Sequence, residues 1–585
     1  MKRALMLALA FATATCAAQT AHYLDCDRGS DTGNSLTPAT AWRTIAQANA
    51  YEFKPGDSLL LHRGARCEGM LAPRGSGTAA APIRIGAYGQ GPLPVIVGGA
   101  APAGLLLDNQ QYWEIANLEI IGGSPYGVRI GGSVPLLHHF RITNLVVHDV
   151  YGEPATKDSG LIVVAPDAKA NTRIDDVVID GVTAYNTTEW AGIIVNGAGF
   201  EAGNSSPHGD GITVRNSIVH DVAGDGILLA RVAHGLIEHN VAWNTGMQQT
   251  ETIGTPDGIW EWMCRDCRVA YNEAFFTDSP GVDGGTFDID FGNEDNIVEH
   301  NFGHDSQGYC LSIFGAEGVT GYSLRSTIRN NTCIHNGRSP RLAKRQGAIY
   351  LSTWQGGRLN GFTIENNTVL WEPPLDTAAF VSDAEFTGNL PNRVVNNTII
   401  AASGSFISAK PGIQFEHNRY CAPHGMRPAD TTGDLCACMR DWLASSGADP
   451  CTEPAASAGP WQLVAVLAPD GKDAAASRSM MTVLASMQHQ FAGRGLRSAV
   501  EFIAPLAPSE IENLRADWHI APQIAIDAAP SPYHVPELLL VSPSGKIDAR
   551  WRSHISPAAV WLRLQSHIGV PLGAQPVQAC TEAHP

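Results

Sequence analysis

Residues 216–221 read Asn-Ser-Ile-Val-His-Asp, and versions of this segment return through the middle of the chain at intervals of 24 to 37 residues. Each version has an Asn and a short apolar run, and many end in His, Asn or Asp. A period of this size predicts a solenoid of stacked coils. Gly181 occupies the place where the interval would otherwise double, and the asparagines are Asn117, Asn144, Asn216, Asn240, Asn272, Asn301, Asn331, Asn367 and Asn397.

The stretches between these asparagines favour strands. They are short, rich in Val, Ile, Thr and Phe, and bounded by Gly, Asn and Asp. Side-chain amides in the same place in successive coils can hydrogen-bond along the stack, which satisfies polar groups at a buried turn. The repeat therefore predicts a coiled ribbon of parallel strands.

The N-terminus and the composition indicate an exported protein. The chain of 585 residues opens Met-Lys-Arg, continues apolar over residues 4–12 and reaches small residues at 16–18. This pattern is typical of a signal peptide, which we place at residues 1–18, and it predicts a secreted or periplasmic protein. No later stretch has about 20 apolar residues, so no transmembrane segment is expected. The formal net charge of −18 disfavours nucleic acid as a partner.

The cysteines also suit an oxidising compartment. Cys26 and Cys67 both lie near the N-terminus and could staple it. Cys264 and Cys267 form a C-x-x-C in a turn between two repeat strands. We interpret this pair as a local loop disulfide rather than a redox centre. A structural zinc site has weak support, because no second C-x-x-C follows at a suitable distance.

The chain divides into segments according to where the repeat pattern begins and ends. An N-terminal cap and the first coils cover residues 22–105, with an amphipathic helix expected over 40–48 and a strand over 58–62. A cap is needed because an open strand edge would template aggregation. The further segments are a β-helix over 106–420, a Cys/Pro/Gly-rich linker or plug over 421–460, an α/β domain over 461–570 and a tail over 571–585.

Residues 35–64, which read SLTPATAWRTIAQANAYEFKPGDSLLLHRG, followed by Asn-rich repeats, resemble the pectate-lyase-like superfamily of secreted proteins. The resemblance covers residues 22–420 and implies a right-handed parallel β-helix of about ten or more coils. It is specific for the fold and weak for the reaction, because the superfamily includes lyases, hydrolases, epimerases, esterases and tail adhesins. The polygalacturonase and pectate-lyase signatures are not matched, so no catalytic set is carried over.

Residues 461–570 alternate between strand and helix patterns, and residues 534–551, HVPELLLVSPSGKIDARW, resemble the Pro-strand-turn-strand element of the thioredoxin fold. Pro536 stands where that family usually holds a cis proline. The C-x-x-C that should follow the first strand is missing. We therefore expect a small, redox-inactive α/β domain that serves structure or binds a protein partner.

A second recurring strand, usually opened by Gly, points to a candidate site. Alternation along TFDIDF directs Phe287, Ile289 and Phe291 inward, and Asp288 and Asp290 outward. Two carboxylates this close can hold one proton between them, or share a divalent cation such as calcium. Paired carboxylates are also the catalytic groups of glycoside hydrolysis.

Other side chains are expected around this pair. At the matching outward places, early coils carry Ile162, Ile194 and Leu228, which predicts a part of the face that another segment covers. Trp260, Trp262 and Tyr350 could stack on sugar rings, and Asp257 and Asp283 border the groove. Glu261 is a further catalytic candidate if the strand slips at Trp260; strict alternation would instead bury it in the core. Candidates for substrate binding from neighbouring loops and turns are His304, Lys344 and Arg345.

Two functions fit these features. The first is a carbohydrate-active enzyme that cleaves a polysaccharide on the outer strand face, by hydrolysis or by β-elimination, with the acid pair favouring hydrolysis. The second is a glycan-binding or surface protein without catalysis, whose aromatic face adsorbs a polymer. A basic loop over Asp288, formed by Lys344 and Arg345, could supply the base that a lyase needs.

Overall fold

The computed structural model describes most of the chain. The described residues are 19–154, 156–167, 170–199, 208–247, 254–316, 322–339, 346–372, 377–401, 405–422, 433–434, 459–468 and 474–571. The predicted signal peptide, Lys344, Arg345 and most of the linker and tail lie outside these residues.

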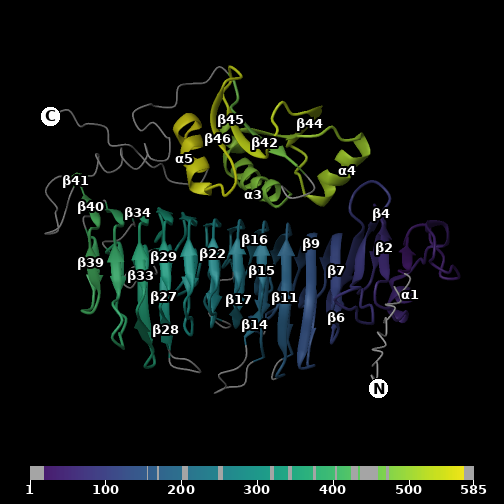
Figure 1. Cartoon of the computed structure of the whole chain (residues 1–585), viewed down its shortest axis with the longest axis horizontal. Coiled ribbons are helices and arrows are strands. Elements are labelled where there is room, and N and C mark those ends of the chain that lie inside the picture. Colours follow the sequence, from purple (N-terminus) through teal and green to yellow (C-terminus); the bar gives the residue numbers. More distant parts are fainter. Residues whose placement is uncertain are drawn as a thin grey trace, which may run out of the picture.

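The molecule is a long parallel β-helix with a C-terminal α/β unit lying along one side of it (Figure 1). The coils form an eleven-stranded sheet and a 26-stranded sheet, and all strand pairs within these two sheets are parallel. The predicted fold is therefore confirmed. The long strands β7 (Trp113–Gly122) and β9 (Leu136–Val150) each turn a corner at an Asn with positive φ, and so join two faces of the coil into the larger sheet.

Each face of the coil is one row of strands. The eleven-stranded sheet comprises β6 (Ala103–Asp108), β8 (Tyr126–Gly132), β10 (Gly160–Pro166), β13 (Ala191–Asn196), β17 (Ile227–Ala230), β21 (Ile259–Trp262), β24 (Phe287–Ile289), β27 (Leu311–Ala316), β31 (Ile349–Trp354), β35 (Phe380–Ser382) and β38 (Ile407–Ala409).

A second row, which we call the covered row because the C-terminal unit packs on it, continues from β9 through β12 (Thr183–Thr187), β16 (Ile218–Val222), β20 (Val241–Trp243), β23 (Glu273–Phe275), β26 (Phe302–His304), β30 (Thr332–Ile334), β34 (Thr368–Trp371), β37 (Thr398–Ala401) and β40 (Arg419–Ala422).

The third row comprises β11 (Arg173–Asp180), β15 (Thr213–Arg215), β19 (Leu236–Glu238), β22 (Arg268–Ala270), β25 (Ile297–Glu299), β29 (Thr327–Arg329), β33 (Thr363–Glu365), β36 (Arg393–Val395) and β39 (Gln414–Glu416).

The N-terminal coils begin earlier than the sequence indicates, because β1 (Ala21–Leu24) already pairs with β2 (Ser58–His62) in the large sheet. The predicted strand 58–62 is confirmed as β2. The expected helix is shorter and later, as α1 covers Ile45–Ala50 and a 3-10 turn occupies Pro38–Thr40. Cys26 and Cys67 form the expected disulfide. A second disulfide, Cys310–Cys333, links β30 to the residue just before β27.

The asparagine ladder exists from Asn240 onward. In each coil the amide Nδ2 donates to the Oδ1 of the next Asn at 2.9–3.1 Å, and the backbone N–H donates to the same oxygen at 2.9 Å. Every amide also donates to a backbone carbonyl of the preceding coil. The ladder members are Asn240, Asn272, Asn301, Asn331, Asn367, Asn397 and Asn418.

The repeat seen in the sequence is in fact two ladders offset by one residue. Asn117, Asn144 and Asn216 have positive φ and stand one position before the inward place. That inward place holds Leu118, Leu145 and Ser217 in these coils. The second ladder begins after Ser217, whose backbone N–H donates to Asn240 Oδ1 at 2.9 Å. Asn tolerates a left-handed backbone better than other side chains, so it recurs at both positions for different reasons.

The C-terminal unit has a five-stranded sheet in the order β44-β43-β42-β45-β46. Strands β42 (Gln462–Leu467), β43 (Arg497–Phe502) and β44 (Ala525–Pro530) are parallel, and β45 (Glu537–Val541) and β46 (Ile547–Trp551) are antiparallel. Its helices are α3 (Ala474–Phe491), α4 (Pro508–Asp517) and α5 (Pro557–Ile568).

These elements lie close to the ranges expected from the sequence. The peptide bond before Pro536 is trans, so this mark of the thioredoxin family is not present; the cis bond of the described residues is Ser124–Pro125. The thioredoxin-like assignment stays a prediction. No helix in the described part of the chain is long and apolar enough to cross a membrane.

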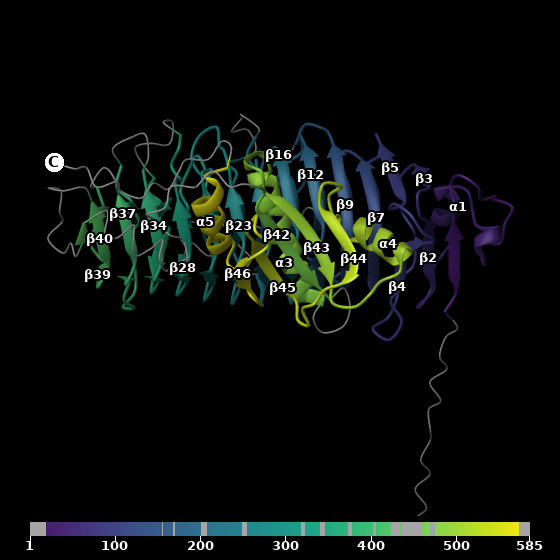
Figure 2. The same ribbon diagram turned by 90° about the horizontal axis from the view of Figure 1, so that it is seen from above.

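The C-terminal unit lies over the covered row (Figures 1 and 2). The contact includes a buried polar cluster around Glu273 on β23. Ser486 Oγ and Gln490 Nε2, both from α3, donate to the Glu273 carboxylate at 2.6 and 2.7 Å. His304 Nε2 lies 3.2 Å from the same carboxylate, and its Nδ1 lies 3.0 Å from Asp305. The partner of this unit within the structure is thus the β-helix of its own chain, and an external protein partner stays a prediction.

His304 belongs to a stack of rings along the covered row. His148, Tyr185, His220, Trp243, Phe275 and His304 stack in sequence with ring centroids 4.4–5.7 Å apart. The prediction that His304 binds substrate is wrong, because the side chain is buried beneath Trp561 of α5, on a different face from β24. The histidines at this repeated position, His148, His220 and His304, are members of the ring stack.

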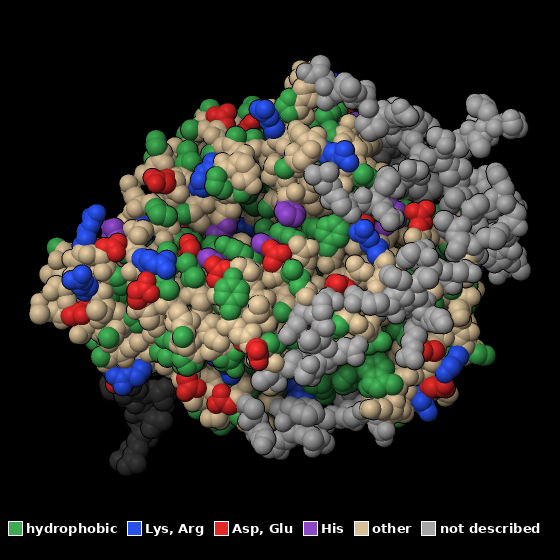
Figure 3. Space-filling view, turned by 180° about the vertical axis from the view of Figure 1, so that it is seen from behind, with side chains coloured by type: hydrophobic (Ala, Val, Ile, Leu, Met, Phe, Trp, Pro, Cys, Tyr) green, Lys and Arg blue, Asp and Glu red, His purple; other side chains and the backbone are tan. Residues whose placement is uncertain are grey.

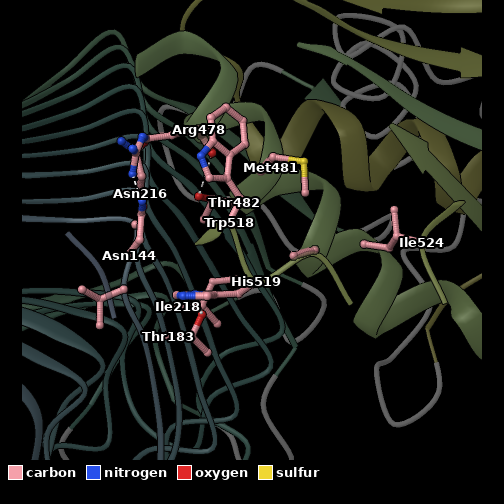
Figure 4. Close-up of a pocket in the computed structure, with 13 residues that line it drawn as sticks. Asn144, Thr183, Asn216, Ile218, Arg478, Met481, Thr482, Trp518, His519 and Ile524 are labelled. Carbon is pink, nitrogen blue, oxygen red and sulfur yellow. Dashed lines mark hydrogen bonds between the residues drawn. The ribbon is translucent and has the colours of Figure 1, made fainter. Parts of the chain in front are cut away.

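A small cleft also lies between the two units (Figure 4). Asn144, Thr183, Asn216 and Ile218 come from the coils, and Arg478, Met481, Trp518 and His519 come from the C-terminal unit. Thr183 Oγ1 and His519 Nδ1 are 2.8 Å apart across it. On the face shown in Figure 3, acidic and basic side chains are interspersed among apolar and neutral ones.

Replacing Asn301 by Ala should destabilise the fold by about 2–4 kcal/mol. The change removes the acceptor of the Asn272 N–H and the donor to the Val269 carbonyl, and each orphaned buried group costs about 1–3 kcal/mol. Urea denaturation measures the loss. Asn330→Gly is the matched control, because Asn330 is exposed and has positive φ. Equal stability of both variants would contradict the ladder as a source of stability.

Stability should fall as the pH rises through the titration of His304. Burial alone lowers the pKa of His304, but the hydrogen bonds to Asp305 and Glu273 outweigh it and hold the pKa above the ordinary 6.5. A raised folded-state pKa contributes stability that is complete below 6.5 and is lost as the pH passes the higher folded value. Thermal unfolding across this range should show the decline, and His304→Gln should flatten that part of the profile. An unchanged profile in the variant would exclude His304 as its source.

Candidate functional site

One outward row of side chains crosses the eleven-stranded sheet in register. Strand pairing aligns Val163, Ile194, Leu228, Trp260, Asp288, Ser312, Tyr350 and Val381 along neighbouring strands. Their character changes from apolar through Trp260 to polar and aromatic. The expected outward position of Ile162 is wrong: Gly160 pairs with Ala191 rather than with Gly192, so Ile162 lies level with the inward Ile193 and Val163 holds the place in the row.

The apolar part of this row is covered, as the sequence predicts. Val163, Ile194, Leu228 and Trp260 are buried together with Trp190, which belongs to the chain just before β13. Asp288, Ser312 and Tyr350 in the following coils are buried as well, and the row first becomes partly accessible at Val381. Trp190 and the apolar side chains packed with it form one wall beside the polar part of the sheet.

Five aspartates gather at this wall, and the turns place them there. Asp225, Asp257 and Asp283 each precede a strand of the eleven-stranded sheet, while Asp288 lies on β24 and Asp290 follows it. Because successive strands stack in register, side chains that precede them in the chain meet at one edge of the sheet. Asp225 accepts from the Asp257 N–H at 3.1 Å, and Asp257 accepts from the Gly285 N–H at 2.7 Å.

Neighbouring donors fix the buried members of this cluster. Trp190 Nε1 donates to Asp225 Oδ2 at 2.5 Å, and the Tyr309 hydroxyl donates to Asp257 Oδ2 at 2.9 Å. Ser312 Oγ donates to Asp288 Oδ1 at 2.5 Å. These three carboxylates are buried and held in place by the protein itself.

Lys157 brings a positive charge into the cluster. Its Nζ lies 3.8 Å from Asp225 Oδ2 and donates to the Thr255 carbonyl at 3.2 Å. The ammonium also lies over Trp190 and Trp260, at 5.2 and 4.8 Å from their ring centroids. Burial lowers the pKa of Lys157, but the surrounding carboxylates, Asp225 first among them, raise it above its usual value. Lys157 is therefore charged.

Burial and mutual repulsion shift the carboxyl pKa values upward. Burial raises the pKa of Asp288 well above its usual value, and the charge of Asp290 raises it further. Burial also raises the pKa of Asp257, with the charges of Asp283, Asp288 and Asp225 adding to it. The pKa of Asp290 rises to about 7, chiefly through burial and partly through Asp283, while the Phe291 N–H and Lys157 oppose the rise.

Exposure separates two members from the rest. Asp283 and Asp290 keep part of their surface accessible, whereas Asp225, Asp257 and Asp288 are buried. A group that reacts with a bound molecule must be reachable. The accessible pair is thus Asp283 and Asp290, rather than the predicted pair Asp288 and Asp290.

Aromatic rings continue from the acids along the face. Trp262 and Phe291 meet edge to face at 5.6 Å between centroids, and Phe291 meets Trp354 at 5.9 Å. Phe314 contacts both Trp354 and Tyr350. Trp354 is 40% exposed, and Trp262 and Phe291 are partly exposed, while Tyr350 is buried.

The predicted inward position of Phe291 is wrong, and this explains Asp290. Phe287 and Ile289 do face the core, but β24 ends at Ile289. Asp290 and Phe291 enter a turn, where Phe291 meets the outer aromatic rings and its N–H donates to Asp290 Oδ1 at 2.8 Å. Alternation therefore holds for Asp288 but not beyond the strand.

Glu261 is not a member of this site. Strict alternation holds along β21, so Trp260 faces outward and Glu261 points into the core between Leu229 and Ile289 of the adjacent strands. Burial raises its pKa to about 8. The catalytic prediction for Glu261 is wrong on this geometry. The predicted local disulfide is also wrong, as Cys264 and Cys267 are free buried thiols.

Other predicted members have mixed outcomes. Trp262 is partly exposed and stays a predicted sugar contact. Trp260, Tyr350 and Asp257 are buried, so the prediction that they contact substrate is wrong. Lys344 and Arg345 lie outside the described residues. Sequence reasoning missed Asp225 and Lys157; for Asp225 the available signal was its place before a strand, the same place that Asp257 holds.

The described aspartates do not form a ligand set for the divalent cation that the sequence predicts between Asp288 and Asp290. Among the described residues, the one group of three or more acidic, His or Cys side chains with donor atoms within 4.8 Å of one another is Glu261, Cys264 and Cys267, and none of the five aspartates belongs to it. A divalent cation such as calcium needs six to eight oxygen ligands. The cluster is better suited to holding protons than to holding calcium.

Comparison with known proteins gives distant likenesses. No family model matches the chain. A lacto-N-biosidase from Bifidobacterium longum subsp. longum is 23% identical over 425 residues, which cover 54% of this chain and 26% of that protein. The match thus spans about a quarter of the length of that relative.

Among solved structures, the GH136 lacto-N-biosidase from Eubacterium ramulus gives a TM-score of 0.47 at 18% identity and covers 68% of this chain and 67% of its own. A PL6 family alginate lyase gives 0.45 at 15% identity and covers 67% of this chain and 52% of its own.

Proposed function

We propose that this chain is a secreted or periplasmic glycan-degrading enzyme, and more specifically a glycoside hydrolase with Asp290 as its general acid and Asp283 as its second carboxylate. The observation that carries the proposal is the pair of accessible carboxylates set among buried acids and beside exposed aromatic rings. Support also comes from the distant likeness to a protein named lacto-N-biosidase.

Asp290 has the properties of a general acid. A pKa of about 7 keeps much of the carboxyl protonated at neutral pH. The protonated group donates to the glycosidic oxygen as the bond to the anomeric carbon breaks, so the leaving sugar departs as a neutral alcohol. Raised pKa values of this kind are the usual device for acid catalysis near pH 7.

Asp283 is suited to the second role. Burial raises its pKa, whereas the Thr255 hydroxyl and the Lys157 ammonium oppose the rise and favour the ionised form. An ionised carboxylate stabilises the positive charge that develops on the sugar, and either attacks the anomeric carbon or takes a proton from the attacking water. If Asp283 attacks, the water that later releases the sugar returns the proton to Asp290. If Asp283 instead takes the proton of the attacking water, it passes that proton to solvent, and solvent reprotonates Asp290.

The charge of the site favours hydrolysis of a neutral glycan over elimination from a polyuronate. A lyase acts on a uronate, and a neighbouring carboxylate cluster repels such an anion. Neutral sugars carry no such penalty, and their apolar ring faces can stack on Trp262, Phe291 and Trp354.

The buried acids have a supporting role. Asp225, Asp257 and Asp288 accept hydrogen bonds from Trp190, Tyr309 and Ser312, and their charge holds the pKa of neighbouring acids upward. The charge of Asp225 helps to raise the pKa of Asp290, so replacing Asp225 should lower that pKa without removing the acid itself.

Asp290→Asn should lower kcat by about 10²- to 10⁴-fold, the usual contribution of a general acid. In the wild type, activity should decline as the pH rises above about 7, because Asp290 loses its proton, and the variant should lose this limb of the profile. Release of reducing ends from a panel of neutral oligosaccharides measures the activity. Asp527→Asn, an exposed change on β44, is the matched control and should keep full activity.

The same assay separates the alternatives. Ultraviolet absorbance of an unsaturated product would identify elimination and overturn the hydrolase assignment. Glycan binding without turnover by the wild type would favour a binding protein. Full turnover by Asp283→Asn and Asp290→Asn would remove the proposed pair.

Trp354→Ala should raise KM by roughly 2- to 10-fold with a smaller change in kcat, because an aromatic stacking contact is worth about 0.5–1.5 kcal/mol. Steady-state kinetics on an active oligosaccharide gives both constants. Tyr533→Ala in the C-terminal unit serves as the aromatic control. A KM equal to that of the control would exclude stacking at Trp354.

A further inference from the structure

A second cluster lies inside the coil, behind the candidate site. Glu261 is on β21, and Cys264 and Cys267 are in the turn that leads to β22. All three side chains are buried. One donor atom from each, a carboxylate oxygen and two thiol sulfurs, lies within 4.8 Å of the others.

We propose that Glu261, Cys264 and Cys267 bind a thiophilic divalent metal ion of the zinc class in the interior of the coil. Two sulfur donors and one carboxylate suit zinc, whereas calcium and magnesium prefer oxygen donors alone. The Cys-x-x-Cys spacing is that of many structural zinc turns. On binding, the two thiol protons leave to solvent and the thiolates become ligands.

The carboxylate gives an independent reason to expect a ligand. Among the described residues, neither oxygen of Glu261 has a hydrogen-bond partner. The side-chain amide of Asn296 acts on the Glu261 carboxyl, but its Nδ2 hydrogen bonds go to other groups. They go to the Cys264 carbonyl at 3.2 Å and to Asn293 Oδ1 at 2.9 Å. An unpaired buried carboxylate is costly, and a metal ion would pair with it.

The turn around the cysteines is already held in shape. Asn293 Oδ1 accepts from the Cys264 N–H at 2.7 Å, and Asn296 Oδ1 accepts from the Cys267 N–H at 2.9 Å. The Gly235 N–H donates to Cys267 Sγ at 3.3 Å, an interaction that stabilises a thiolate. Backbone supports of this kind orient metal ligands before the ion arrives.

The ion would anchor the strand beneath the candidate site. Trp260 and Trp262 flank Glu261 on β21 and point to the opposite side of the sheet. Fixing Glu261 from the inside would therefore fix both rings on the outside. The function of this centre is structural and does not depend on the proposed hydrolysis.

The test is a metal analysis of the intact, full-length chain. Protein purified in the presence of zinc should contain about one zinc per chain, the stoichiometry of a single structural site. Replacement by cobalt should give the intense near-ultraviolet absorption of sulfur-to-cobalt charge transfer. Glu261→Gln, which keeps both thiols and the side-chain shape, should weaken zinc binding at least about tenfold. Glu238→Gln on β19 is the control and should bind normally.

Other outcomes overturn the proposal. A Cys264–Cys267 disulfide in a non-reduced peptide map would mean that the pair is oxidised instead. Free thiols without bound metal after incubation with zinc would leave no ion at the site. Cobalt binding without the sulfur absorption would place the metal elsewhere. Because Cys264→Ser with Cys267→Ser could fail to fold, Glu261→Gln carries the comparison.

Discussion

The structure depends on registry between coils, and the buried amide ladder enforces it. Each ladder Asn satisfies both a backbone N–H and a side-chain amide of the coil before it. A coil displaced by one residue would orphan these groups and turn its apolar side chains outward. Because registry is fixed on one corner of the coil, the positions on the other faces are fixed as well. The row from Val163 to Val381 is a consequence of that constraint.

The candidate site uses this registry to crowd like charges. Turns before β17, β21 and β24 bring three aspartates to one edge, and Asp288 on β24 and Asp290 just after it add two more. Crowding and burial raise their pKa values, and one partly buried ammonium limits the repulsion. A site of this kind is costly in stability, and the stacked coils around it supply the rigidity that holds it. The chemistry then follows from which acids remain reachable.

The sequence was sufficient for the fold because the signal repeats. Period, strand composition and turn residues predicted the coils, and the strand and helix pattern after residue 461 predicted most elements of the C-terminal unit. The site was predicted less well. Alternation placed Asp288 correctly, yet it could not reveal that β24 ends at Ile289, which is a local backbone event. Lys157 and Asp225 meet only because the chain around Lys157 folds over the sheet, and no short-range pattern encodes that contact.

The C-terminal unit changes how the solenoid should respond to stress. In a stack of coils each unit contacts only its neighbours, so unfolding can spread from either end. Here the unit reaches from Arg63 and Gly91 near the first coils to Phe302 on β26. It bridges coils that are far apart along the axis and links their opening into one cooperative event. Its apolar cluster also includes Ile334, Leu370 and Ile400 of the later coils, so those coils should open together with it rather than one by one.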